Sequence, residues 1–228
     1  MTVKGWLGLG LVLGASHAQG MANEPTEHAV KVDGHYRPQR VEPAPHRGVD
    51  YLFDLAWDSK YVSEGRRELD RGGIFWAGTG VQWDDLLPFA GVGRGDTEHY
   101  IEWNFGLEYG FSLTDSVEAS VGYERIEIYG DERDDDNELL AALGYSRWDK
   151  FEPALTYHYS TGADGHFVEL SIHSHWSLTE QIVVSPYVLQ AFDYGFVNED
   201  YRGANHLQLG VEAEWALSEA EWALSGRI

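Results

Sequence analysis

Cysteine is absent from the 228 residues of this chain. Without it the protein has no disulfide framework, no thiolate metal site and no cysteine nucleophile. Basic residues are also scarce, because 16 Lys and Arg stand against 38 Asp and Glu, which leaves a formal net charge of −22. Binding to a phosphate backbone needs clustered Lys and Arg, so we expect no nucleic-acid partner. A membrane barrel, in contrast, tolerates a heavily charged lumen and charged loops.

Long apolar runs are missing as well, and no segment approaches the roughly 18 consecutive apolar residues of a membrane-spanning helix. The apolar stretch at residues 6–15 is ten residues long and follows Lys4. This order, with Ser-His-Ala at 16–18 as the cleavage sequence, is typical of a secretory signal peptide. We predict a cleaved signal peptide over 1–18 and a flexible polar leader over 19–49, which holds four of the seven prolines.

Aromatic residues are abundant, with nine Trp, thirteen Tyr and nine Phe. From Asp50 onward, apolar residues alternate with polar ones. In residues 101–111 the odd positions are all apolar, from Ile101 to Phe111, and the even positions are Glu, Asn or Gly. Side chains alternate across a strand, so this segment has one apolar face and one polar face. Its length also suits a tilted membrane strand.

The same alternation predicts further strands along the chain. They lie at 51–58, 74–83, 86–93, 117–124, 138–147, 151–160, 168–176, 182–192 and 207–215. Long connections at 62–72, 130–137 and 193–204 alternate with shorter ones such as 148–149, as in an outer-membrane barrel. The strands of a soluble β-sandwich also alternate between apolar and polar residues. The aromatic residues crowded near the strand ends favour a membrane barrel, which uses such residues as girdles at the membrane interfaces.

The sequence therefore predicts an all-β protein: an antiparallel transmembrane up-and-down β-barrel over residues 50–228, with its N-terminus in the periplasm. Ten strands reach Trp215, and part of an eleventh lies at 220–227. Closed bacterial barrels have an even number of strands. We expect 10–12 strands and favour twelve, with the last one missing from the C-terminal end.

Several short segments carry a family resemblance. They are Asp58-Ser59-Lys60-Tyr61-Val62 followed by Glu64-Gly65-Arg66, then Phe89–Arg94, Gly122-Tyr123 leading to Tyr129-Gly130, and Asn137-Glu138. Their order resembles the TorF family of porin-like exported proteins, also called the Gcw_chp family. The resemblance covers about residues 50–215 and implies a pore or envelope role without catalytic residues. Ser63 and Glu64 stand near the Phe-Arg positions of that family, so no role is carried over for that Arg.

The polar faces of the expected strands are rich in carboxylates. The acidic residues expected to line the lumen are Asp54, Glu102, Glu108, Glu118, Glu124, Glu152, Glu169, Glu212 and Glu214. Rings of carboxylates favour cations in a pore. We therefore expect a narrow, cation-preferring channel for ions or small hydrophilic solutes, with no cofactor. The alternative is a plugged barrel whose carboxylates pair with the few lumen bases.

Two weaker patterns concern metal ions. His158, His173, His175 and His206 fall on expected inner faces, and imidazole suits Zn, Cu or Ni. The acidic loop residues Asp131, Asp134, Asp135 and Asp136 form a second pattern, which suits Ca²⁺ or a divalent bridge to lipopolysaccharide. Ordinary polar lining and a solvated charge run are the competing interpretations.

Two other classes of function stay open. Ser171, Ser174 and the neighbouring histidines offer Ser and His together, as in a small-barrel lipid hydrolase, but no Gly-x-Ser-x-Gly elbow is present. A non-conducting scaffold or binding barrel that presents the loops at 62–72 and 193–204 is the other. We expect no enzyme activity. Expected partners are outer-membrane lipid, lipopolysaccharide and small solutes or cations, in the outer membrane of a Gram-negative bacterium.

Overall fold

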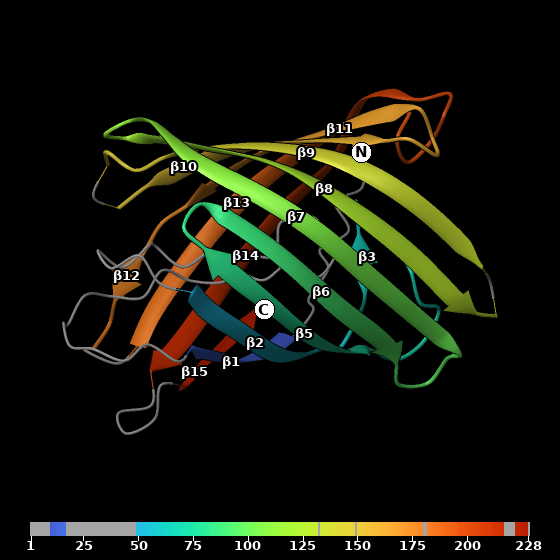
Figure 1. The fold of residues 1–228 in the computed structure, drawn as a ribbon, viewed down its shortest axis with the longest axis horizontal. Helices are drawn as coiled ribbons and strands as arrows, with labels where there is room; N and C mark the ends of the chain where they lie inside the picture. Colours follow the sequence, from blue (N-terminus) through green and yellow to red (C-terminus); the bar gives the residue numbers. More distant parts are fainter. Residues whose placement is uncertain are drawn as a thin grey trace.

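The computed structural model describes residues 10–16, 49–131, 133–148, 150–179, 182–216 and 222–227 (Figure 1). Its strands are β1 (Gly10–Ser16), β2 (Val49–Asp58), β3 (Val62–Ser63), β4 (Arg66–Arg67), β5 (Ile74–Trp83), β6 (Leu86–Gly95), β7 (Tyr100–Thr114), β8 (Val117–Gly130), β9 (Asp134–Tyr145), β10 (Glu152–Ser160), β11 (Gly165–His173), β12 (Trp176–Ser177), β13 (Ile182–Tyr194), β14 (Arg202–Ala216) and β15 (Trp222–Arg227). Among these residues no helix is long and apolar enough to cross a membrane.

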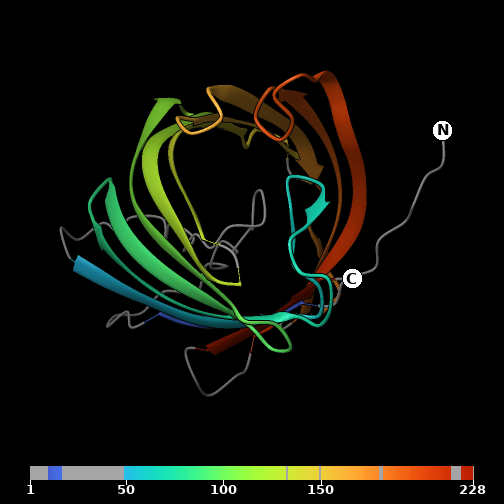
Figure 2. The same ribbon diagram turned by 90° about the vertical axis from the view of Figure 1, so that its right-hand side faces the viewer.

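The strands close into a ring, which Figure 2 shows from one end. Thirteen strands of the described residues form one sheet in the order β11-β10-β9-β8-β7-β6-β5-β2-β1-β15-β14-β13-β12. Pairing of β11 with β13 closes this sheet, so the two-residue β12 stands outside a ring of twelve. All the pairs in the ring are antiparallel, for example β7 with β8 and β13 with β14. The predicted all-β antiparallel barrel is confirmed.

The ring differs from the prediction at its closing strand. We expected the missing strand at the C-terminal end, but β1 completes the ring by pairing with β2 on one side and β15 on the other. Gly10–Ser16 therefore forms a strand in the structure, although it belongs to the predicted signal peptide. Cleavage of residues 1–18 stays a prediction. Residues 19–48 of the predicted leader lie outside the described residues.

The connections also differ from the prediction at two places. The prediction of a long loop at 130–137 is wrong, because β8 runs to Gly130 and β9 already begins at Asp134. Cross-strand pairing makes this extension possible, since Arg125 Nη2 lies 2.6 Å from Asp135 Oδ2 and offsets one of the crowded negative charges. The very short turn expected at 148–149 is also wrong, because β9 ends at Tyr145 and β10 begins at Glu152.

The wall has an apolar outside and a polar inside. On β2, the side chains of Tyr51, Phe53 and Leu55 are 55%, 58% and 58% exposed. On β7, Trp103 is exposed, whereas its neighbour Glu102 on the opposite face is fully buried. This arrangement is the reverse of a soluble domain and matches a barrel whose outer band faces lipid.

Two apolar clusters lie inside the ring, on opposite walls. The first contains Ala56, Tyr61, Leu69, Ile74 and Trp76, with Tyr100 packed against it. The second contains Phe167, Tyr187, Leu189 and Ala191, with Phe196 and Val197 packed against it. Each cluster includes residues from a connection as well as from strands. The barrel core therefore holds two connections against the inner wall.

Candidate functional site: a hairpin inside the barrel

The β2–β5 connection, residues 59–73, folds into the barrel rather than outward. Its short hairpin, β3 with β4, lies inside the ring in the end view (Figure 2). Glu64 and Gly65 make the turn with φ values of 43° and 76°. Such left-handed backbone favours glycine, which explains Gly65. Tyr61, Ser63, Glu64 and Leu69 are each at most 4% exposed, so the hairpin is packed and not loosely draped.

The base of the hairpin is bonded to β7. The Tyr61 hydroxyl donates to Glu102 Oε2 at 2.7 Å, and the Tyr100 hydroxyl donates to the same oxygen at 2.5 Å. Asn104 Nδ2 donates to the other oxygen, Oε1, at 3.0 Å. Glu102 and Asn104 are both fully buried. A buried carboxylate is costly unless hydrogen-bonded, and these three donors meet that need.

Aromatic packing supports the same base. The Tyr61 ring meets the Trp76 ring edge-on at 5.5 Å between centroids. Trp76 itself fits because β6 has Gly93 beneath it, where a Cβ would lie 2.6 Å from the indole. Burial, followed by the negative charge of Glu102, raises the pKa of the Tyr61 hydroxyl well above its usual value. Tyr61 therefore stays a hydrogen-bond donor over the physiological pH range.

The tip of the hairpin reaches β14, the third strand from β2 around the ring. A Cβ on Gly65 would lie 2.6 Å from His206 Nδ1 and 2.7 Å from Asn205 Oδ1, both on β14. The hairpin thus extends from β2 and β5 to β14 and occupies the part of the interior beside these strands. A segment in this position narrows any passage through the ring.

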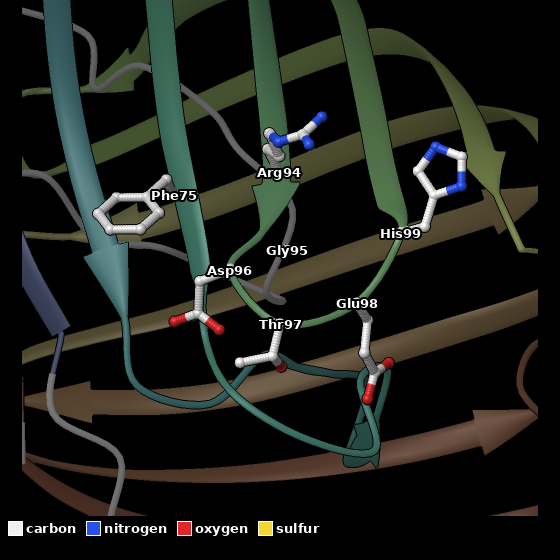
Figure 3. Close-up of a pocket in the computed structure, with 7 residues that line it drawn as sticks. All are labelled: Phe75, Arg94, Gly95, Asp96, Thr97, Glu98 and His99. Atoms are coloured by element: carbon white, nitrogen blue, oxygen red, sulfur yellow. The ribbon is translucent and has the colours of Figure 1, made fainter.

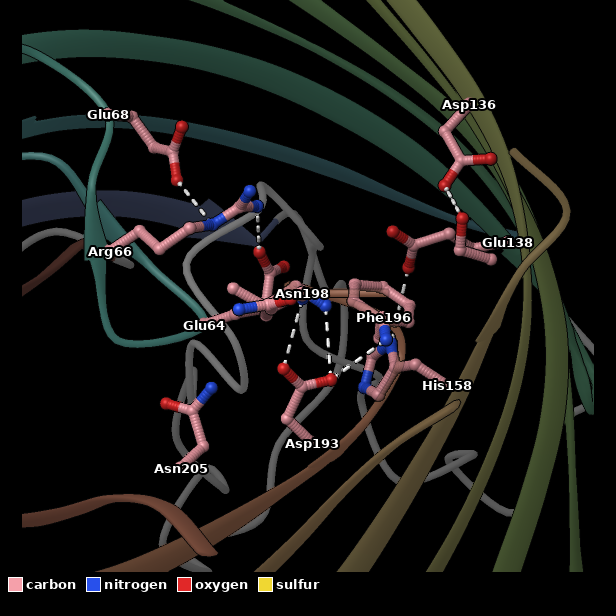
Figure 4. Close-up of polar contacts among 12 residues, drawn as sticks. Glu64, Arg66, Glu68, Asp136, Glu138, His158, Asp193, Phe196, Asn198 and Asn205 are labelled. Carbon is pink, nitrogen blue, oxygen red and sulfur yellow. Dashed lines mark hydrogen bonds and ion pairs between the residues drawn. The ribbon is translucent and has the colours of Figure 1, made fainter. Parts of the chain in front are cut away.

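Arg66 brings a positive charge into this space. Its Nη2 lies 2.7 Å from Glu64 Oε2 and its Nε lies 3.4 Å from Glu68 Oε1 (Figure 4). The Arg66 side chain is 49% exposed, whereas that of Glu64 is 3% exposed. Burial by itself lowers the pKa of Arg66, but the charges of Glu64 and Glu68 outweigh it and raise that pKa, so the guanidinium remains charged.

A second connection, residues 195–201, folds against the other wall. Asp193 Oδ1 accepts the backbone N–H groups of Phe196 at 2.8 Å and Val197 at 3.1 Å, and Oδ2 accepts that of Asn198 at 3.1 Å (Figure 4). Asp193 is 1% exposed. The Phe196 ring packs on Phe167 and meets His158 edge-on. This local carboxylate cap and the packing of Phe196 hold the connection against the inner wall.

The predicted lumen carboxylates occupy several environments. Glu102, Glu124 and Glu169 are buried, Asp54, Glu108 and Glu212 are half-buried, and Glu118 and Glu152 are exposed near strand ends. The side chain of Glu214 lies outside what the structure describes. The alternation therefore identified the carboxylate face, but it could not show that Glu102 is an anchor for the hairpin. Their role in ion selectivity stays a prediction.

The polar residues inside the barrel also include Glu138, His158, Asp193 and Arg66. Of these, only His158 was proposed from the sequence as a candidate site residue. Glu138 is opposite Glu124 across the β8–β9 ladder, and its Oε2 lies 3.3 Å from His158 Nδ1. Glu138 is 2% exposed. The signal for Glu138 was present in the alternation of residues 138–147, which was noisier than in other strands.

The predicted metal-binding histidines do not share one cluster. His175 Nδ1 lies 2.8 Å from Ser185 Oγ, and its Nε2 lies 3.1 Å from Glu152 Oε2. His173 stacks on Tyr187, His158 contacts Glu138 and His206 lies at the hairpin tip. Within the described part of the chain, no three His, Asp or Glu side chains come together in a way that could hold a metal ion.

The four acidic residues predicted to form a cation site in a loop make separate contacts in the structure. Asp135 meets Arg125, whereas Asp136 accepts from Ser160 Oγ and from Gly162 N. Asp134 Oδ1 accepts the backbone N–H of Asp135, and Asp131 lies 3.8 Å from His99. The four carboxylates therefore serve four different contacts. A shared divalent cation would require them to move.

The serines considered for a hydrolase are engaged elsewhere. Ser174 Oγ accepts from Trp176 Nε1 at 2.8 Å, while Ser171 and Ile172 belong to the β11–β13 ladder. His175 instead pairs with Ser185, which is buried within β13. The other ring nitrogen of His175 contacts the Glu152 carboxylate, so the three groups follow the order of nucleophile, base and orienting acid. Ser185 is only 6% exposed, which leaves its hydroxyl poorly accessible to a lipid substrate.

Comparison with known proteins adds a likeness of fold. No family model matches the chain, so the resemblance to the TorF family stays a prediction. No curated protein matches it either. A solved structure described as "KdgM porin in complex with disordered oligogalacturonate" aligns over 97% of this chain and 98% of its own, with a TM-score of 0.47 and 8% identity.

Proposed function

We propose that this protein is a narrow outer-membrane pore that passes ions or small hydrophilic solutes and prefers cations. The observation that carries the proposal is the β3–β4 hairpin, which lies inside the ring and reaches β14. It places Arg66, flanked by Glu64 and Glu68, inside a barrel whose inner face carries half-buried carboxylates such as Asp54 and Glu108. Clustered carboxylates in a confined passage raise the local concentration of cations.

The outer face supports a membrane location. Exposed aromatic and aliphatic side chains cover β2 and β7, while the backbone of each strand in the ring of twelve is paired on both sides. A closed ring satisfies its backbone hydrogen bonds without water, which is the condition for crossing lipid with strands. An exposed apolar band on such a ring favours insertion into a bilayer.

The size of the ring supports a restricted passage. Barrels of about eight strands are filled by their own side chains, whereas those of about 16–18 strands leave an aqueous channel. A ring of twelve lies between these limits. The infolded hairpin and the connection at 195–201 then determine how much of the interior stays open.

The test is the reversal potential of the refolded protein in a planar bilayer under a KCl gradient. We expect cation preference in the native protein. We expect stronger preference in Arg66→Gln, because the substitution removes a positive charge from the passage. Arg71→Gln is the matched control, since the Arg71 side chain is 79% exposed on the connection. Anion preference in the native protein would overturn the proposal.

A second candidate function is a closed envelope barrel that presents its loops. The two apolar clusters inside the ring favour it, because they occupy interior space on both walls. Such a barrel would insert into the bilayer and remain electrically silent. Single-channel recording of protein shown by protease protection to be inserted separates the two functions.

A further inference from the structure

The outer face of the barrel carries a shallow hollow of about 480 Å³ beside the connection that joins β6 to β7. Phe75, Arg94 and His99 line it together with residues 95–98 (Figure 3). The Phe75 side chain is 57% exposed, and Arg94 and His99 are exposed as well. The hollow lies where the apolar wall meets the loops at the hairpin end of the barrel.

The two acidic side chains of the hollow are engaged by neighbouring groups. Asp96 Oδ1 accepts the backbone N–H of Gly73 at 2.9 Å, and Oδ2 accepts from Trp57 Nε1 at 3.3 Å. Glu98 Oε1 accepts from Arg71 N at 2.6 Å and Oε2 accepts from Asp70 N at 3.3 Å. Figure 3 shows the Glu98 carboxylate turned toward the hairpin connection. Both carboxylates thus serve to hold residues 70–73.

These donors are neutral N–H groups, so Asp96 and Glu98 keep their charges but direct them toward Trp57 and residues 70–73, while the Arg94 guanidinium stays exposed at the hollow. Nearby acids have their own partners, because Asp131 lies against His99 and Asp135 lies against Arg125. Among the described residues, no carboxylate forms an ion pair with Arg94. An exposed guanidinium beside an exposed aromatic ring suits an amphiphile with an anionic head.

A second guanidinium lies two strands away on the same side of the wall. Arg94 pairs in register with Ile101, and Ile101 pairs with Tyr129. Arg133 stacks over the Tyr129 ring at 5.1 Å. Neighbouring strands are about 4.8 Å apart, so the row from Arg94 to Tyr129 spans about 10 Å. This span refers to backbone positions, and the Arg133 guanidinium lies over the ring at its far end. Two guanidinium groups on one side of the wall suit a headgroup with two phosphates better than a headgroup with one.

We propose that this surface binds the bisphosphorylated headgroup of lipid A, with one phosphate at Arg94, the other at Arg133 and an acyl chain along Phe75. The proposal rests on the proposed outer-membrane location, but it does not depend on conduction. Arg binds phosphate oxygens through two parallel N–H donors, which makes it suitable for this role. Phosphate contacts of this kind weaken as salt concentration rises.

The test compares lipids on the full-length protein refolded in detergent. Native mass spectrometry would measure retention of bisphosphoryl lipid A, monophosphoryl lipid A and phosphatidylglycerol. We expect the bisphosphoryl lipid to be retained at least tenfold better than phosphatidylglycerol. Arg94→Gln should remove most of that difference, and Arg133→Gln should lower the response to the bisphosphoryl lipid to that of the monophosphoryl one. Arg147→Gln, an exposed arginine in the connection at 146–151, is the matched control.

Equal retention of all three lipids, or an unchanged response in Arg94→Gln, would overturn the proposal. Conduction is measured separately in phosphatidylcholine bilayers, which contain no lipid A. A protein that binds lipid A and does not conduct would defeat the pore and leave this site standing. A protein that conducts and shows no preference for phosphorylated lipid would defeat the lipid A site and leave the pore standing.

Discussion

Two connections fold into this barrel, and they are held in different ways. The hairpin at 59–73 is anchored by side chains of a distant strand, because Tyr61 donates to Glu102 and packs on Trp76. The connection at 195–201 is held by hydrogen bonds to the strand that immediately precedes it, because Asp193 accepts three backbone N–H groups from the next few residues, and the Phe196 ring packs on Phe167 of the wall. The hydrogen bonds of the hairpin reach a strand far away in the sequence, whereas those of the second connection are local. Substitutions at the two anchors should therefore affect different parts of the barrel interior.

The largest effect is expected from Glu102→Ala. It leaves the donors of Tyr61, Tyr100 and Asn104 without their acceptor inside the barrel. Each buried donor without a partner costs about 1–3 kcal/mol, so the hairpin should leave the wall. We expect a larger and noisier single-channel conductance and proteolysis within residues 59–73. Glu108→Ala on the same strand is the control, and an unchanged conductance in Glu102→Ala would show that the hairpin does not limit the passage.

Gly65→Ala attacks the opposite end of the hairpin. The left-handed φ of 76° and the approach of 2.6 Å to His206 both oppose a Cβ. Left-handed backbone costs a non-glycine residue about 1–2 kcal/mol. We expect the tip to withdraw from β14 while the base stays bonded, which would give a smaller rise in conductance than Glu102→Ala. In Gly144→Ala, the control, the new Cβ meets no atom within 4 Å.

Asp193→Ala tests the connection at 195–201. The substitution leaves the backbone N–H groups of Phe196, Val197 and Asn198 without the carboxylate. Hydrogen exchange should accelerate at 195–201 and remain unchanged at 59–73. Asp200→Ala in the same connection is the control. Faster exchange in the hairpin as well would mean that the two connections are one cooperative unit, which would remove the contrast between them.

The smallest effect concerns alkaline pH. The pKa of Tyr61 is raised in the folded protein, and an ordinary tyrosine has a pKa of about 10. The contribution of Tyr61 to stability is therefore complete below about pH 10 and declines above it, as the unfolded chain ionises first. Urea unfolding between pH 8 and pH 11 should show a steeper loss for the native protein than for Tyr61→Phe. Parallel pH profiles would contradict this.

Much of the wall could be predicted from the sequence, because a strand with one face in lipid and one in the lumen must alternate. Residues 101–111 became β7 and the apolar side of β2 faces outward. The strand at Gly10–Ser16 could not be predicted from alternation, since this short apolar run resembles a signal peptide. An intact mass lacking residues 1–18 would support cleavage, and the ring would then need a different closing strand.

The interior was harder to predict, because contacts between a connection and a distant strand leave no periodic signal. Nothing local marks Tyr61 as a partner of Glu102, and Arg66 lies in a segment that was expected to be an outer loop. Asp193 was expected to begin the connection at 193–204, whereas β13 runs on to Tyr194. The carboxylates were found as a set, but the sequence did not distinguish the anchor Glu102 from the exposed Glu118.

The contact between Gly65 and β14 has a consequence for assembly. The hairpin belongs to the early part of the chain, while His206, which it touches, belongs to one of the later strands. Contacts between residues so far apart form late, because loop closure must precede them. A barrel that is still open at its seam would expose the hairpin tip to protease. Protection of that tip would therefore report the completion of the whole ring, which links the maturation of the constriction to the final step of folding.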